Sequence, residues 1–318
     1  MNRLIRPLAA TLLSLATSGA LAFPDRPITI IVPFNAGTTN DINARDLAQV
    51  LSAVAKQPVL VDNRAGAEGT LGGQALVNGP ADGHTLMFSS NSLTVFDPLL
   101  KKNIPYDPNK DIVPICAAGR TNNLVNVSAT GPYKSLADLI AAAKSQPGKL
   151  TFGYTSTSMR LAGELFQQAS GTKLTGVPYR SSVTGLTDVS SGQVDITFID
   201  RVSAQAFYDS GKIRPLAVSG PSRLSALPDV PSAKELGLPA YSVFPWFGVY
   251  ASGKTPPDVL AQVRELVARA VTTPEMAANM EKRGLEPFTA CGDALVKHKQ
   301  QETEQWREVI RKAGIEPQ

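Results

Sequence analysis

The stretch Pro27-Ile28-Thr29-Ile30-Ile31-Val32 decides the fold class, because a short run of β-branched apolar residues is typical of a strand that is buried on both faces. A polar loop, residues 35–40, follows this strand, and residues 41–56 then carry apolar side chains at helical spacing. Residues 58–61 and 85–88 predict the next strands. Strands that alternate with helices in this way predict an α/β fold with largely parallel sheets.

Hydroxyl side chains mark where several helices are expected to begin. Ser135 and Thr255 each stand three residues before an aspartate, which is the spacing of a capping box, so each is expected to cap a helix. Ser156 or Thr157 is expected to cap a further helix, which Gly171 ends.

The length of the chain, 318 residues, is sufficient for two domains of ordinary size, and no low-complexity linker divides it. Two α/β domains without a linker imply that the chain passes between them within the folded body. A cleft then lies between the domains, and small ligands tend to bind in such clefts.

Residues 1–22 have the order of a secretory signal peptide. Arg3 and Arg6 give a positive start, an apolar stretch covers residues 8–21, and Ala20-Leu21-Ala22 has the small-x-small form of a cleavage site. A membrane anchor is the alternative, but the stretch is shorter than the about 20 residues that span a bilayer, and hydroxyl residues dilute it. We therefore predict export to the periplasm, cleavage after Ala22, and a soluble mature protein.

The charge balance argues against two classes of partner. The 31 lysines and arginines against 27 aspartates and glutamates give the whole chain a charge of +4, and loss of Arg3 and Arg6 leaves +2 on the mature protein. So small a charge over two domains argues against nucleic-acid binding and against a role at a membrane surface.

The chain has two cysteines, Cys116 and Cys291. An oxidising compartment would permit a disulfide between them, but two residues so far apart in sequence say nothing about geometry. The interpretation favoured by the sequence is two buried free thiols, because lone cysteines are commonly buried.

Motifs of catalysis and of cofactor or metal binding are weak in this sequence. Residues 248–255 fit the phosphate-loop pattern G-x-x-x-x-G-K-T, but two prolines follow at once, so the match is interpreted as accidental. The glycines of residues 66–73 lack dinucleotide-site spacing, His84 and His298 have no partner at ligand spacing, and no G-x-S-x-G occurs. The sequence therefore predicts a binding protein without cofactor, metal or catalytic residues, and not an enzyme.

Three loops rich in hydroxyl and amide side chains follow predicted strands, at residues 35–40, 89–92 and 155–158. The first and the third lead directly into predicted helices. A helix N-terminus offers free N–H donors and the positive end of the helix dipole, so two of them facing one cleft make an anion site. Each loop alone is more often ordinary capping. Their joint position at the carboxyl ends of strands is where open α/β sheets bind ligands.

Nine short motifs occur in order along the chain. They are residues 23–28 with 32–34, 62–67, 81–86, 105–108 with 110–111, 161–165, 177–180, 192–195, 227–231 and 246–248. Through these motifs the chain resembles the Bug family of extracytoplasmic solute receptors, which serve tripartite tricarboxylate transporters.

The resemblance implies a monomeric two-domain periplasmic binding protein, of the Venus flytrap type, that closes around a ligand in the cleft between its domains. After a signal peptide of residues 1–22, residues 23–123 and 246–318 would form a discontinuous domain 1. Residues 124–245 would form domain 2.

The function implied by the resemblance is capture of a small organic carboxylate for uptake through the membrane permease subunits of a tripartite tricarboxylate transporter. A dicarboxylate is favoured, and an aromatic ligand stays open. Two alternatives also stay open: a sensory partner that reports its ligand to a membrane sensor kinase, and a hydrolase or other enzyme on a similar two-domain fold.

The family holds a ligand carboxylate, partly through ordered water, between two loops that correspond here to residues 34–41 and 155–158. Five positions depart from the family pattern, three of them in the first loop. The first loop usually reads Pro-Pro-Gly-Gly and here reads Asn35-Ala36-Gly37-Thr38, Arg160 stands where many members have histidine, and Ser181 stands where glycine is common. The predicted ligand-binding residues are Phe34, Thr38, Thr39, Asn40, Asp41, Ser90, Asn91, Thr155, Ser156, Thr157, Ser158, Arg160, Ser181 and Asp200.

The chemistry of a dicarboxylate adds a hypothesis about Arg160. Two helix N-termini can satisfy one carboxylate without a formal charge, and an arginine offers a planar pair of donors for a second one. We therefore expect a dianion whose remote carboxylate is held by Arg160, with Phe34 and Tyr154 beside the spacer between its two ends. The alternative is that Arg160 lies on the outer face of its helix in a surface ion pair.

Overall fold

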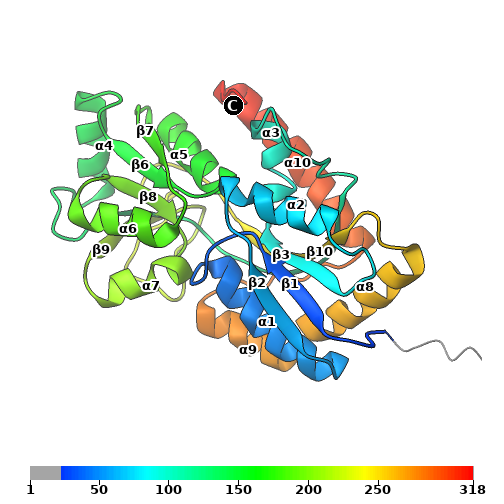
Figure 1. Cartoon of the computed structure of the whole chain (residues 1–318). Coiled ribbons are helices and arrows are strands. Elements are labelled where there is room, and N and C mark those ends of the chain that lie inside the picture. Colours follow the sequence, from blue (N-terminus) through cyan, green and yellow to red (C-terminus); the bar gives the residue numbers. More distant parts are fainter. Residues whose placement is uncertain (1–22, 318) are drawn as a thin grey trace, which may run out of the picture.

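The strands of residues 23–317, the part of the chain that the computed structural model describes, form two five-stranded sheets. The first lobe is built on the strand order β2-β1-β3-β10-β4 and the second on the order β7-β6-β8-β5-β9. The lobes lie side by side, with the second in green at the left of Figure 1 and the first largely in blue and cyan. The two-lobed α/β architecture predicted from the sequence is therefore confirmed.

The elements of each lobe follow the chain in two blocks. Those of the first lobe are β1 (Ile28–Val32), α1 (Thr39–Ala55), β2 (Val59–Asn63), η1 (Ala67–Gly69), α2 (Thr70–Asn78), β3 (Thr85–Ser90), η2 (Asn91–Leu93), α3 (Asp97–Leu100), β4 (Ile112–Arg120), β10 (Trp246–Ser252), α8 (Pro257–Val271), α9 (Pro274–Arg283) and α10 (Asp293–Ala313). Those of the second lobe are β5 (Leu124–Ser128), α4 (Leu136–Ser145), β6 (Thr151–Tyr154), α5 (Thr157–Ser170), β7 (Thr175–Pro178), α6 (Ser182–Ser191), β8 (Ile196–Ile199), α7 (Arg201–Asp209) and β9 (Ile213–Val218).

The expectation of largely parallel sheets is wrong, because both sheets are mixed. In the first, β1 runs parallel to β2 and β3, but β10 runs antiparallel to β3 and β4. In the second, β6 runs parallel to β7 and β8, but β5 runs antiparallel to β8 and β9. β5 and β10 are the first strands after the chain passes from one lobe to the other. They enter their sheets without the crossover helix that imposes a parallel direction.

Segments 121–123 and 219–245 connect the two sheets, and the strands on either side of each segment belong to different lobes. The predicted domain boundaries, 123/124 and 245/246, are kept as a proposal. One large apolar cluster lies at the first sheet, and a second joins residues of both lobes. Leu47 of α1 and Val267 of α8 cover the first sheet, and Phe152, Phe166 and Phe198 pack together in the second lobe.

Two of the three predicted helix caps are confirmed. Ser135 forms a capping box with Asp138 at the start of α4, and Ser156 accepts from the backbone N–H of Met159 at the start of α5. Gly171 ends α5 in the left-handed conformation that favours glycine. The prediction for Thr255 is wrong, since α8 begins at Pro257 and the N-cap position is Pro256.

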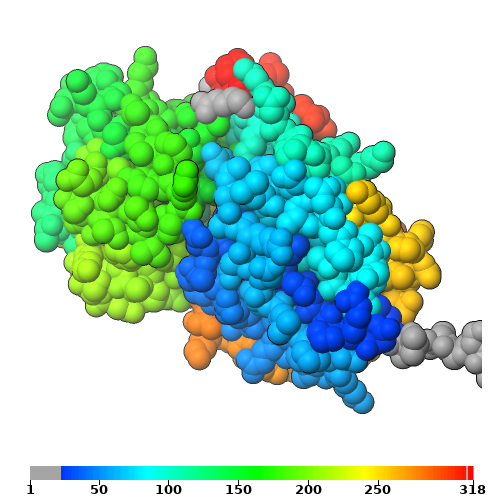
Figure 2. Space-filling model, viewed as in Figure 1, coloured from blue at the N-terminus to red at the C-terminus, as the bar shows by residue number. Residues whose placement is uncertain are grey.

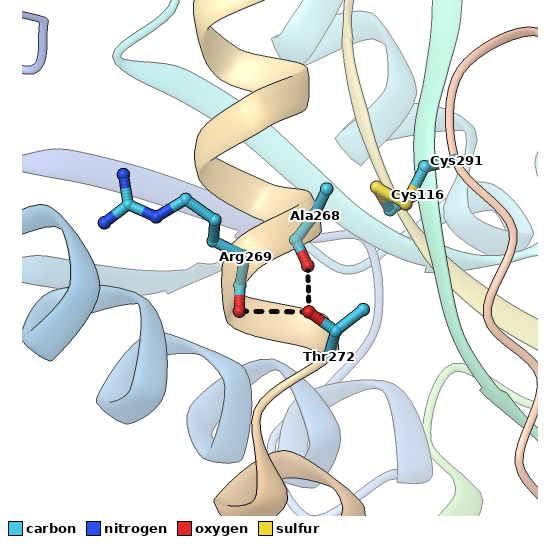
Figure 3. Close-up of a disulfide and its surroundings, with 5 residues drawn as sticks. All are labelled: Cys116, Ala268, Arg269, Thr272 and Cys291. Carbon is cyan, nitrogen blue, oxygen red and sulfur yellow. Dashed lines mark hydrogen bonds between the residues drawn. A yellow bond between two sulfur atoms is a disulfide. The ribbon is translucent and has the colours of Figure 1, made fainter.

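The interpretation of two free thiols is also wrong, because Cys116 and Cys291 form a disulfide (Figure 3). The backbone N–H groups of Ala117 and Gly119 in β4 donate to the carbonyls of Ala290 and Phe288. This antiparallel pairing places the two cysteines opposite each other, with their Cα atoms 4.1 Å apart, although 175 positions separate them in sequence. The contact is set by strand pairing between distant segments, which no local pattern reveals.

The residues of the phosphate-loop match do not form such a loop. Residues 248–252 lie within strand β10, and the Lys254 ammonium donates to the carbonyl of Val77 at 3.1 Å, at the end of α2. Over residues 23–317, no helix is long and apolar enough to cross a membrane. The predicted signal peptide, residues 1–22, lies outside the described residues.

Candidate functional site

Two adjoining cavities lie where the lobes face each other. The inner chamber, of about 50 Å³, has room for a few water molecules or one carboxylate group. The outer chamber, of about 400 Å³, has room for the rest of a small organic molecule. Phe34, Thr38, Thr155 and Ser182 line both chambers, so the two cavities are continuous parts of one site. In Figure 2 the green second lobe meets the blue first lobe along a seam.

Four helix N-termini converge on the inner chamber. Its walls include Thr38 at the N-cap of α1, Ser156 at the N-cap of α5, Asp200 at the N-cap of α7 and Ser182, the first residue of α6. The positive ends of four helix dipoles therefore lie at the same small volume. Several first-turn N–H groups, such as those of Thr39 and Ser158, donate to neighbouring hydroxyls. This arrangement favours an anion.

The loop that precedes α1 is held by a buried carboxylate. Asp41 accepts hydrogen bonds from the backbone N–H of Gly37 at 2.9 Å, from the Asn63 amide at 3.0 Å and from the Arg45 guanidinium at 3.0 Å. Burial raises the pKa of Asp41, but these hydrogen bonds outweigh burial and hold it below its usual value. Gly37 has a φ of +81°, a conformation that residues other than glycine adopt at a cost.

Asp200 joins the two lobes at the floor of the inner chamber. Its carboxyl group accepts from the Thr39 hydroxyl across the cleft, and from the backbone N–H and hydroxyl of Ser203 at 3.0 and 3.2 Å. The Thr39 backbone N–H also donates to the Ser203 hydroxyl at 3.0 Å. Burial raises the pKa of Asp200 above its ordinary value. The carboxyl of Asp200 is thus committed to the contact between α1 and α7.

The polar lining of the inner chamber is neutral apart from Asp200. In the described part of the chain, none of the residues lining it is a lysine or an arginine. Two buried side-chain atoms that belong to its walls, the Asn40 Oδ1 and the Asn123 Nδ2, have no hydrogen-bond partner within residues 23–317. Buried polar atoms are normally satisfied, so these two are available to a bound molecule or to water.

Nine of the fourteen predicted site residues line the inner chamber. These are Phe34, Thr38, Thr39, Asn40, Ser90, Thr155, Ser156, Ser158 and Asp200. The other five, Asp41, Asn91, Thr157, Arg160 and Ser181, line neither chamber.

Asp41, described above, is one of four among these five residues whose side chains make contacts within the protein. The other three are Asn91, Thr157 and Arg160. The Asn91 amide donates to Glu302 at 2.9 Å, and the Thr157 hydroxyl donates to Asp97. Ser181 is the N-cap residue of α6 and makes no side-chain cap bond within the described chain. It precedes Ser182, which does line both chambers.

Arg160 lies away from both chambers. It is buried, its guanidinium approaches the carbonyl of Glu316 at 3.5 Å, and it lines a separate hollow with Glu164 and Gly314 beyond the end of α10. The hypothesis that Arg160 holds a remote carboxylate therefore has no geometric support. Its position on α5 was read correctly from sequence, but the face it occupies depends on how α5 packs against the C-terminal segment.

The structure adds residues that sequence reasoning missed. Arg180 and Glu68 line the outer chamber, and Ser182, Ser203 and Asn123 line the inner one. Arg180 lies in the motif of residues 177–180, but the sequence alone gives no role for its side chain. Ser203 gave no signal in the sequence, because only the packing of α7 against α1 brings it to the chamber.

No cofactor or metal is indicated by the geometry. Within residues 23–317, no group of three or more histidine, cysteine, aspartate or glutamate side chains has an arrangement that could hold a metal ion. The hydroxyl, amide and backbone donors of the two chambers can hold a small anionic molecule without a covalent step.

Comparison with known proteins gives one family. Residues 43–315 match the family described as the tripartite tricarboxylate transporter family receptor. The UPF0065 protein in the tcbD-tcbE intergenic region of Pseudomonas sp. (strain P51) is 33% identical over 96% of this chain and 93% of its own length. Protein BugT of Bordetella pertussis is 32% identical over 97% of this chain and 98% of its own length.

Solved structures give the same picture. Rpa4515 of R. palustris, described with adipate, superposes with a TM-score of 0.87 at 31% identity and covers 93% of this chain and 100% of its own. The periplasmic binding protein BugD has a TM-score of 0.86 at 27% identity, over 93% of this chain and 100% of its own. MatC of Rhodopseudomonas palustris, described with bound malate, has a TM-score of 0.81 at 26% identity, over 91% and 100%.

Proposed function

Because the chain belongs to the tripartite tricarboxylate transporter receptor family, we propose that it binds a dicarboxylate between its lobes and delivers it to the membrane permease of such a transporter. Proteins of this family are periplasmic solute receptors and not enzymes. The observation that carries the proposal for this chain is the convergence of four helix N-termini on one small chamber. Relatives described with adipate and malate support the choice of a dicarboxylate.

The first carboxylate is proposed to occupy the inner chamber. Its oxygens would accept from first-turn N–H groups that make no other hydrogen bond, and from Ser156 or Ser158, which line that volume. These two hydroxyls share one hydrogen bond of 3.0 Å, which leaves one of their two protons for the ligand. The Thr38 hydroxyl already donates to the Asn35 carbonyl at 2.9 Å. The unpartnered amide nitrogen of Asn123 adds a further donor. Neutral donors of this kind hold an anion without the desolvation of a second buried charge.

The second carboxylate is proposed to lie in the outer chamber beside Arg180. This arginine is exposed and lines the outer chamber next to Tyr179, whereas Arg160 lies elsewhere. A guanidinium can hold a carboxylate through two parallel N–H donors. Glu68 on the opposite wall disfavours a second carboxylate at any position close to it, so the ligand is expected to extend toward α6.

The contacts between the lobes support closure around the ligand. Thr39 contacts Asp200 and Ser203 across the cleft, and the backbone N–H of Ser158 donates to the Ser92 hydroxyl at 3.2 Å. These bonds can form only when the lobes are together. We propose that ligand binding favours this closed arrangement and that opening breaks these bonds, as in other hinged binding proteins.

The test is calorimetric titration of the mature protein with adipate and with hexanoate, which has the same number of carbons but only one carboxylate. Adipate is expected to bind at least tenfold more tightly, which corresponds to about 1.4 kcal/mol. Arg180→Ala should remove this preference. Arg160→Ala is the matched control and should keep it.

The outcomes separate the parts of the proposal. If Arg160→Ala and not Arg180→Ala loses the preference, the assignment of the second carboxylate is wrong. If adipate and hexanoate bind the wild-type protein equally, the ligand is not selected as a dianion. If no dicarboxylate of four to six carbons gives saturable binding, the carboxylate proposal itself fails for this chain.

A further inference from the structure

A third cavity, of about 440 Å³, lies between α10 and the second lobe. Its walls come from α10 and from the segment that leads into β10, with Arg120 of β4, Leu165 of α5, Trp246 of β10 and Phe288 completing them. It shares no lining residue with the inner or outer chamber, so it is a separate site. The proposed capture of a carboxylate makes no use of it. We call it the rear cavity.

Aromatic side chains form much of the rear cavity. Trp246, Phe288 and His298 form a cluster in which ring centroids lie 4.8 to 5.9 Å apart, and Phe244 and Trp306 complete the lining. Phe244, Phe288 and Trp306 are partly exposed to solvent. Part of each of these rings is therefore open to the cavity, and the faces of tryptophan and phenylalanine carry the negative lobe of the ring quadrupole.

One carboxylate stands among these rings. Glu302 accepts hydrogen bonds from the indole N–H of Trp246 at 2.6 Å, from the indole N–H of Trp306 at 3.4 Å and from the Asn91 amide at 2.9 Å. All three donors are neutral. Within residues 23–317, no ion pair joins Glu302 to a lysine or an arginine, although its side chain is only 12% exposed. Burial raises the pKa of Glu302 to about 6, which leaves the carboxylate ionised at neutral pH.

The other titratable groups at the rear cavity do not balance this charge. Arg120 lines the cavity and lies over the Phe244 ring, 5.7 Å from its centroid. It is paired with Glu286, with 2.9 Å between the guanidinium nitrogen and the carboxylate oxygen. His298 approaches Glu302 only to 3.9 Å, and burial together with the nearby Arg120 lowers its pKa, so it is neutral at pH 7. Because Glu286 offsets the charge of Arg120, the carboxylate of Glu302 is the one charge at the cavity without a lysine or arginine partner within residues 23–317.

We propose that the rear cavity binds a small organic ammonium ion, whose positive charge lies beside Glu302 and against the faces of Trp306 and Phe288. Buried charges in proteins are normally paired, and Glu302 has neutral donors but no cation. Aromatic rings attract a cation by about 0.5–2 kcal/mol each, depending on how far it is desolvated. The negative charge of Glu302 repels an anionic ligand, and a neutral apolar ligand has no charge that Glu302 could attract.

The two tryptophans provide the assay. The chain contains only two, and both Trp246 and Trp306 line the rear cavity, so intrinsic tryptophan fluorescence reports on this site. The mature protein is titrated with choline and, in parallel, with 3,3-dimethylbutan-1-ol, which has the same shape without the charge. Choline should give a saturable change with a Kd of about 1 mM or below, at least tenfold tighter than the alcohol.

Charge-altering variants test the role of Glu302. Glu302→Gln keeps the size of the side chain and removes its charge, so choline affinity should fall at least tenfold while adipate binding is retained. Because this buried substitution could also unfold the protein, a second pair uses the exposed Gln305 at the cavity wall. Gln305→Lys should weaken choline binding and Gln305→Glu should strengthen it. Gln300→Lys, on the same helix but outside the cavity lining, is the matched control and should change nothing.

Three outcomes would overturn the proposal. The first is equal binding of choline and its neutral analogue. The second is the absence of saturation up to roughly 10 mM choline, well above the expected Kd. The third is an affinity in Gln305→Lys equal to that in Gln300→Lys. Failure of adipate binding in the wild-type protein would instead concern the front chambers and leaves the rear cavity proposal standing.

Discussion

Reduction of the disulfide between Cys116 and Cys291 should destabilise the protein by several kcal/mol. The bond closes a segment whose ends are 175 positions apart. In the chain-entropy model, a closed loop of that length lowers the entropy of the unfolded chain enough to contribute about 5 kcal/mol at 25 °C. Measured disulfides usually contribute about 2–4 kcal/mol, so the expected loss lies between about 2 and 5 kcal/mol. That is a large part of a typical total stability of about 5–15 kcal/mol.

The measurement is urea unfolding of the mature wild-type protein with and without a reductant. The double variant Cys116→Ala/Cys291→Ala is the control, since its unfolding midpoint should not respond to the reductant. The reduced wild type keeps both sulfur atoms in place, so its loss of stability is free of the cavity that alanine would create. Unfolding of the first lobe should be affected most, because the bond ties β4 to the segment before α10.

Two results would refute this reasoning. One is the detection of two free thiols in protein that was denatured without a reductant. The other is a change of less than about 1 kcal/mol on reduction of a bond that is shown to be present, which would mean that the unfolded chain is not constrained as the chain-entropy model requires.

Three further predictions follow from the sequence and the structure. N-terminal sequencing of the exported protein should return Phe23, and recovery of Met1 would contradict the predicted cleavage. Small-angle scattering should show a smaller radius of gyration with saturating adipate than without it, and an unchanged radius would argue against closure. Burial raises the pKa of Asp97 to about 6, so the folded protein binds this proton more tightly than the unfolded chain, and Asp97 contributes less to stability as the pH rises from 4 to 6. The test compares the free energy of unfolding of the wild type with that of Asp97→Asn by urea unfolding. The difference, wild type minus variant, should fall by up to roughly 3 kcal/mol between pH 4 and 6 and stay constant above pH 7. A difference that does not change with pH would refute this prediction.

Local features of the fold were predictable from the sequence. The strand at residues 28–32 follows from its β-branched run, and the starts of α4 and α5 follow from Ser135 and Ser156. These signals act within a few residues of the backbone they specify. The predicted cap at Thr255 is wrong because Pro256, the next residue, occupies the N-cap position.

Features set by distant contacts were not predictable in the same way. The disulfide depends on pairing between β4 and residues 286–290, and the antiparallel direction of β10 depends on where the chain re-enters the first sheet. At the candidate site, Thr38 and Ser156 line the inner chamber, because strand ends and helix caps locate them. Their contact with a ligand stays a prediction. The positions of Arg160 and Arg180 relative to the chambers could not be predicted in this way. The orientation of Arg160 depends on the packing of α5 against the C-terminal segment.

The convergence of helix N-termini on the inner chamber also affects how such a site can change over evolutionary time. A peptide N–H belongs to every residue except proline, so most substitutions at the chamber would leave its donors in place. The outer chamber is different, since side chains such as Arg180 and Glu68 shape it and single substitutions can replace them. Substitutions at the outer chamber in a gene duplicate could therefore change which molecule is bound, while the backbone donors of the inner chamber are kept.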